Sequence, residues 1–178
     1  SRSLPPRKCS DLTVARTAKA PDSTRPPPRL RRAYYDCRYG QLHLHNAIPS
    51  GGGFDELTSV VCVHGSNETA RVFVPLLGIL GLERSVYAPD LPGYGESDPA
   101  AGQSSVEAGV HALADFLDSM RIRSVDLLAR GDGAEIAQRL AKLRGAGVRK
   151  VVALSAVDAA SADLPQKLLA TLGGTQPT

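Results

Sequence analysis

Short apolar segments alternate with amphipathic ones along most of this chain, and that alternation limits the possible folds more than any other feature. Ser59–Val63 reads SVVCV, a continuous run of mostly β-branched residues that is typical of a strand buried on both faces. Similar short runs at Val86–Ala88, Val125–Leu128 and Val151–Val157 are separated by longer segments. Strands that alternate with helices form a parallel sheet with helices on its faces. The sequence therefore predicts an α/β fold.

The longer segments have helical signals. Ser104 and Glu107 form a capping box at the start of the first predicted helix. Its apolar residues recur at helical spacing and form one stripe: Val106, Val110, Leu113, Leu117 and Met120. A second helix is predicted over 133–143 and ends at glycines. A short third helix is predicted around 164–172.

The amino-terminal segment differs in composition from the rest of the chain. Residues 1–32 hold six of the 13 prolines and a net charge of +7, so residues 33–178 carry −4 of the overall +3. Such a segment buries too little apolar surface to offset chain entropy, and we expect a disordered basic tail. The folded domain is then expected over 33–178. It begins with two strands, Tyr34–Tyr39 and Gln41–Ala47, joined at Gly40.

Composition also excludes several classes of protein. The chain has no apolar run of 18 residues, so we expect no membrane partner. Its three cysteines, Cys9, Cys37 and Cys62, are unclustered, which argues against a disulfide scaffold or a cysteine zinc site and suits a cytoplasmic protein. The tail lacks the aromatic residues that stack on bases, so no nucleic-acid partner is expected. We expect no cofactor and no metal.

Three loops follow the predicted buried strands in order: His64-Gly65-Ser66, the segment 89–98 (PDLPGYGESD) and the tight strand–helix turn 129–133 (ARGDG). This series resembles the α/β-hydrolase superfamily over about 34–157. The resemblance implies a doubly wound, mostly parallel sheet and hydrolysis of an ester or related bond in a small molecule. Because the family's sheet continues beyond a sixth strand, 33–178 is expected to be the N-terminal part of such a domain, with about six strands, incomplete at the C-terminus.

By this resemblance the third loop is the nucleophile elbow, which needs small residues two positions before and after the nucleophile. Only one register fits, with Ala129 and Gly133 as the small pair, so Gly131 occupies the nucleophile position and has no side chain. The backbone N–H groups of Ser66 and Asp132 are the implied oxyanion-hole donors. The residues expected to shape the surrounding loops are His64, Gly65, Asp90, Gly93, Gly95 and Ser97. His64 is expected to orient its loop, and Asp90 and Asp98 to hydrogen-bond within theirs.

The family takes its catalytic base from beyond the elbow, but the four histidines of this chain (43, 45, 64 and 111) all precede it. We therefore expect the chain as it stands to be inactive. An alternative is a non-catalytic pseudoenzyme that binds a ligand or partner with the same fold. A minor alternative is a Rossmann-type dinucleotide-binding protein, suggested by Gly131 and Gly133, although Ile136 stands where the third glycine would fall. His43 and His45 share a strand face but lack a further ligand for a metal.

The last predicted strand is expected to form one edge of the sheet. If no strand pairs beyond Val151–Val157, this apolar edge is uncovered. We therefore expect possible self-association through the exposed sheet edge, in addition to a small-molecule substrate or ligand.

Overall fold

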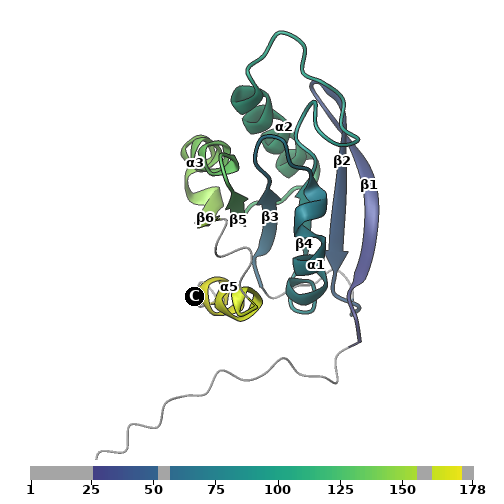
Figure 1. Cartoon of the computed structure of the whole chain (residues 1–178), viewed down its shortest axis with the longest axis vertical. Helices are drawn as coiled ribbons and strands as arrows, with labels where there is room; N and C mark the ends of the chain where they lie inside the picture. Colours follow the sequence, from purple (N-terminus) through teal and green to yellow (C-terminus); the bar gives the residue numbers. More distant parts are fainter. Residues whose placement is uncertain (1–25, 52–56, 156–161, 174–178) are drawn as a thin grey trace, which may run out of the picture.

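The computed structural model describes residues 26–51, 57–155 and 162–173, and in this part six strands form one sheet in the order β1-β2-β4-β3-β5-β6 (Figure 1). The strands are β1 (Arg29–Cys37), β2 (Gly40–Ile48), β3 (Ser59–Val63), β4 (Val86–Pro89), β5 (Val125–Arg130) and β6 (Val148–Leu154). β4, β3, β5 and β6 run parallel, whereas β1 pairs antiparallel with β2, and β2 with β4. The carboxyl ends of β3, β4 and β5 therefore lie at one edge of the sheet.

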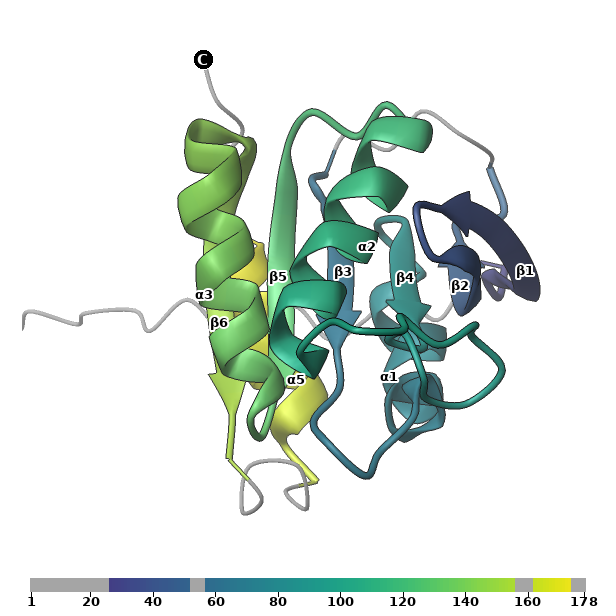
Figure 2. The ribbon, with the colours of Figure 1, turned by 90° about the horizontal axis from the view of Figure 1, so that it is seen from above.

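Helices cover both faces of the sheet. The α-helices are α1 (Val74–Leu80), α2 (Ser105–Ser119), α3 (Gly133–Arg144) and α5 (Leu164–Leu172), and the 3₁₀-helices are η1 (Ala70–Phe73) and η2 (Gly145–Gly147). α2 and α3 pack in one core with β2, β3 and β5, and α1 and α5 pack in the other (Figure 2). This is the three-layer arrangement expected for an α/β fold.

The continuous apolar strands explain why two cores exist. Successive side chains of a strand point to opposite faces. In β3, Val61 and Val63 enter the α2–α3 core, whereas Val60 and Cys62 enter the α1–α5 core. All four are fully buried, so this strand needs apolar residues at consecutive positions.

Several predicted elements are confirmed. Ser104 is the N-cap of α2, and its hydroxyl oxygen accepts a hydrogen bond from the N–H of Glu107 at 3.3 Å. The predicted helix around 164–172 is α5. β6 ends at Leu154 and begins three residues earlier than the predicted strand, because Val148 already pairs with Val125. Within the described residues, no helix has the length and apolar character needed to cross a membrane.

One expectation for the amino-terminal half is corrected, and one helix there was not predicted. β1 begins at Arg29, so the predicted strand start at Tyr34 is too late, and residues 29–32 form a strand rather than part of a disordered tail. Its first residues are exposed and lack an apolar pattern, but their backbone pairs with β2, where Arg29 lies opposite Ile48. The expected disorder of the rest of the tail falls on residues 1–25, which lie outside the described residues. α1 was not predicted, because Pro75 and Gly78 interrupt the helical signal in its seven residues.

Candidate active site

The turn between β5 and α3 has the geometry of a strand–helix elbow. Gly131 has a φ of +57°, in the left-handed region that favours glycine. A Cβ added at Gly133 would overlap the carbonyl oxygen of His64 and would lie 2.8 Å from that of Val63, so this position requires glycine. A Cβ added at Gly131 would meet only the Cα of Gly65, at 3.9 Å. The turn therefore has space for a side chain at position 131, and the sequence supplies none.

These contacts also explain the pair of glycines that suggested a dinucleotide fingerprint. Gly131 and Gly133 allow β5 and α3 to approach the loop after β3. Ile136 is 5% exposed and packs in the core against α2 rather than facing a phosphate site.

His64 joins the loop after β3 to the loop after β4. Its Nε2 accepts a hydrogen bond from the N–H of Leu91 at 2.9 Å, so its Nδ1 carries the proton and donates to the carbonyl oxygen of Gly65 at 2.8 Å. Burial lowers the pKa of His64 and keeps the ring neutral. Both ring nitrogens are therefore occupied by backbone groups, and neither is available to act as a base.

One of the two implied oxyanion donors, the N–H of Ser66, already has an acceptor. The N–H of Ser66 donates to Oδ1 of Asp132 at 2.6 Å, and the hydroxyl of Ser66 donates to Oδ2 of the same carboxylate. In this structure the N–H of Ser66 therefore contacts a side chain, and its role as an oxyanion donor stays a prediction. The hydroxyl and then the amide of Ser66 hold the pKa of Asp132 below its usual range, so the carboxylate remains charged at this place.

Asp90 organises the loop after β4 and lies apart from the elbow. It is 3% exposed, and its carboxylate accepts hydrogen bonds from the N–H of Ala70 at 2.7 Å, Nδ1 of His43 at 2.8 Å and the N–H of Glu96 at 3.2 Å. Burial alone would raise the pKa of Asp90, but these hydrogen bonds outweigh it and lower the pKa. The residue therefore has the hydrogen-bonding position expected for it.

The other residues of this loop fit around Asp90. The hydroxyl of Ser97 donates to the carbonyl oxygen of Asp90 at 2.7 Å. Gly93 and Gly95 have φ values of +82° and +54°, and a side chain at Gly95 would overlap the Asp90 carboxylate. Oδ2 of Asp98 accepts from the N–H of Gln41 at 2.8 Å, which fastens the loop to β2.

The remaining histidines lie away from the elbow. The rings of His43 and His45 are 5.0 Å apart, and no group of three or more His, Cys, Asp or Glu suited to a metal occurs among the described residues. Nδ1 of His111 lies 2.9 Å from the hydroxyl of Tyr39.

Sequence reasoning missed three residues that contact the expected site. Nε of Arg130 lies 2.9 Å from Oε1 of Glu68, and Oε2 of Glu68 accepts from the N–H of Gly65 at 3.3 Å. The ring of Tyr94 packs edge-on against His64, with centroids 5.4 Å apart. Tyr94 lines a small recess of about 50 Å³ beside the elbow with Ser66 and Asp132.

Comparisons with known proteins agree with this architecture. A model of the alpha/beta hydrolase family matches residues 60–177. The curated relative "Lipase LipV" of Mycobacterium tuberculosis is 34% identical over 113 residues, which are 64% of this chain and 41% of the relative. The chain therefore spans about two fifths of the length of this relative.

Solved structures show the same fold. A mutant of the epoxide hydrolase of Vigna radiata superposes with a TM-score of 0.63 and 22% identity, covering 71% of this chain and 39% of that structure. The carboxylesterase CesB of Bacillus subtilis superposes with a TM-score of 0.61 and 18% identity, covering 71% of this chain and 43% of that structure.

Proposed function

Because the chain belongs to the alpha/beta hydrolase family, we propose that its elbow receives a small molecule with an ester or related bond and, as the sequence stands, does not cleave that bond. The names of the relatives, a lipase, a carboxylesterase and an epoxide hydrolase, support a small-molecule substrate class.

The single observation that carries this proposal is Gly131. Acyl transfer needs a nucleophilic side chain that is held at the reacting carbonyl. The left-handed turn has open space at position 131, yet glycine offers no atom that could attack. The neighbouring Asp132 lies one residue beyond the position that Ala129 and Gly133 flank, and two hydrogen bonds from Ser66 hold its carboxylate.

The Asp132 carboxylate also opposes catalysis electrostatically. A tetrahedral intermediate is stabilised by N–H donors that face its developing negative oxygen. Here the N–H of Ser66 faces a carboxylate that is already negative. A second anion at this place would be repelled, so the arrangement suits a neutral ligand better than an oxyanion.

A test of this proposal compares ester turnover by the wild type, Gly131→Ala, and Gly131→Cys combined with Asp132→Ala. Asp132→Ala frees the N–H donor of Ser66. Gly131→Ala is the control, because it carries the same backbone strain at positive φ without a nucleophile. With p-nitrophenyl butyrate, we expect release at the buffer rate for the wild type and Gly131→Ala. The double variant is expected to release up to one equivalent of nitrophenol per chain, because a thiol is partly ionised at neutral pH and attacks the ester without a neighbouring base.

Catalytic turnover by the wild type that Asp132→Ala abolishes would contradict the proposal and identify Asp132 as a nucleophile. If no variant reacts but neutral esters raise the melting temperature of the wild type, the binding-protein form of the proposal is favoured over a decayed enzyme.

A further inference from the structure

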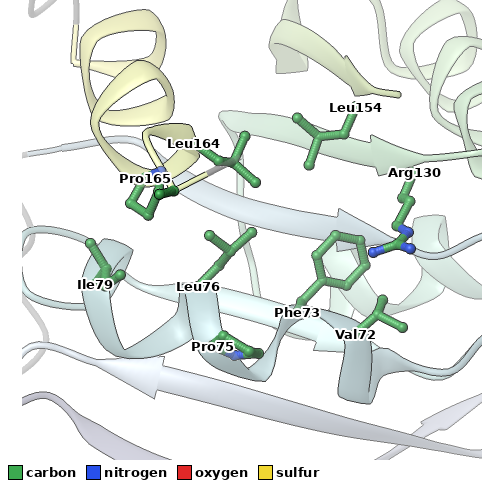
Figure 3. Close-up of a pocket in the computed structure, with 10 residues that line it drawn as sticks. Val72, Phe73, Pro75, Leu76, Ile79, Arg130, Leu154, Leu164 and Pro165 are labelled. Atoms are coloured by element: carbon green, nitrogen blue, oxygen red, sulfur yellow. The ribbon is translucent and has the colours of Figure 1, made fainter. Parts of the chain in front are cut away.

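A second cavity lies on the opposite side of the sheet from the elbow recess. It has a volume of about 260 Å³ and lies between η1 and α1, the carboxyl ends of β5 and β6, and the start of α5 (Figure 3). Its walls are apolar and include Phe73, Leu76, Ile79, Leu154 and Leu164. Among the described residues that line it, Arg130 alone carries a charge.

The alternation of β5 places Arg130 in this cavity. Leu127 and Ala129 face the α2–α3 core, whereas Leu128 faces the α1–α5 core, so Arg130 follows Leu128 to the same side. Figure 3 shows Arg130 at one end of the cavity and Ile79 at the other. The arginine is adjacent to Gly131 in sequence, but it lines this cavity, whereas Asp132 lines the recess beside the elbow.

Glu68 leaves much of the hydrogen-bonding capacity of Arg130 unused. A guanidinium has five N–H donors in a planar fork that matches a carboxylate. Nε lies 2.9 Å from Glu68, which is the carboxylate that pairs with it within the described residues. Glu68 is also tied to the loop after β3 through the N–H of Gly65. The arginine therefore combines a fixed position with donors that a second acceptor could use.

We propose that this cavity binds a small apolar carboxylic acid, with its carboxylate on Arg130 and its apolar chain along Phe73 and Leu76 toward Ile79. An apolar wall with one fixed cation is the usual composition of a site that orients an amphiphilic molecule. The volume equals roughly nine water-sized spaces of about 30 Å³ each, which suits an acid of about eight carbon atoms. The site does not depend on Gly131 or Ser66, so it goes beyond the function proposed for the elbow.

The test is calorimetric titration of the full chain with sodium octanoate, with octan-1-ol as the ligand that lacks a carboxylate. We expect octanoate to bind and Arg130→Gln to weaken it about tenfold, the usual loss for a hydrogen bond to a charged group. Arg139→Gln is the matched control. Arg139 is an exposed arginine of α3 that pairs with Glu135, and its loss is expected to leave octanoate affinity unchanged.

Two further variants make the test independent of misfolding. Glu68→Gln removes the anion that competes for Arg130, so octanoate should bind several-fold more tightly, a gain that an unfolded variant cannot show. Ile79→Trp shortens the far end of the cavity, so the preference should move from octanoate toward butanoate.

Several results would overturn the proposal: no octanoate binding at millimolar concentration, equal affinities for octanoate and octan-1-ol, or unchanged affinity in both Arg130→Gln and Glu68→Gln. None of these results bears on turnover at the elbow, so the two proposals fail separately.

Discussion

Asp90 and Asp132 are both carboxylates with a lowered pKa, but they stabilise different contacts. Asp90 is buried and accepts three hydrogen bonds that join β2, η1 and the loop after β4. Asp132 is exposed and joins the elbow to the loop after β3 through Ser66. Asp90 therefore supports the loop after β4, whereas Asp132 accepts a hydrogen bond from the N–H of Ser66 beside the elbow.

Replacing Asp90 with asparagine should lower the free energy of unfolding by about 2 kcal/mol at pH 7, since charge-assisted hydrogen bonds are lost. The pKa of Asp90 is lowered from 3.8 in the folded state, so its charge stabilises the fold above that pH, and the stabilisation is lost as the pH falls through the lowered value. Urea unfolding between pH 3 and 7 should therefore show the difference between wild type and variant shrinking below about pH 4.

Asp118→Asn is the control for that series. The side chain of Asp118 is 67% exposed and pairs with Arg144, so its loss should cost less than about 1 kcal/mol. A cost at Asp90 as small as the control, or one that stays constant down to pH 3, would contradict the role assigned to Asp90.

The sequence alone was enough to place Gly131 but not to place the Asp132 side chain. Gly131 follows from a local requirement, because the elbow needs small residues at Ala129 and Gly133. The contact between Ser66 and Asp132 joins residues 66 positions apart. Its geometry depends on how the loop after β3 and the elbow meet at the edge of the sheet, which no local pattern encodes.

At the scale of elements, prediction succeeded where burial imposes a pattern. The apolar residues of β3, β5 and α2 pack in the two cores, and this packing produces the apolar patterns from which these elements were predicted. Prediction was wrong for the start of β1, where exposed residues pair only through the backbone. It missed α1, which is seven residues long and stabilised by packing against the sheet rather than by helix propensity.

β6 lies at one edge of the sheet, where another chain could pair with it. Among the described residues it pairs with β5 alone, and Val151 is 37% exposed. Unpaired strand edges that carry apolar residues tend to pair with other chains, and a lysine on such an edge opposes this. We predict that the wild-type chain self-associates with increasing concentration and that Val151→Lys reduces this association.

Val74→Lys is the matched control for the edge, because Val74 is also 37% exposed but lies on α1. Light scattering over a concentration series should show association for the wild type and for Val74→Lys. A wild type that remains monomeric at high concentration, or an equal effect of both variants, would refute the prediction.

At the scale of the whole molecule, the sheet separates two recesses that flank β5. One lies beside the elbow with Ser66 and Asp132, and the other lies between α1 and α5 with Arg130. The function proposed for the first recess rests on family membership, whereas the proposal for the second rests on the side chains that line it. The hydrogen bond from Gly65 to Glu68 connects the two, since Glu68 also contacts Arg130.

Mass spectrometry after reaction with a fluorophosphonate gives the sharpest check that the elbow holds no nucleophile. We expect no adduct on residues 129–133 or on Ser66 of the wild type, under conditions in which an active serine hydrolase is fully modified. A stoichiometric adduct on Ser66 or Asp132 of the wild-type chain would show instead that a nucleophile is present there.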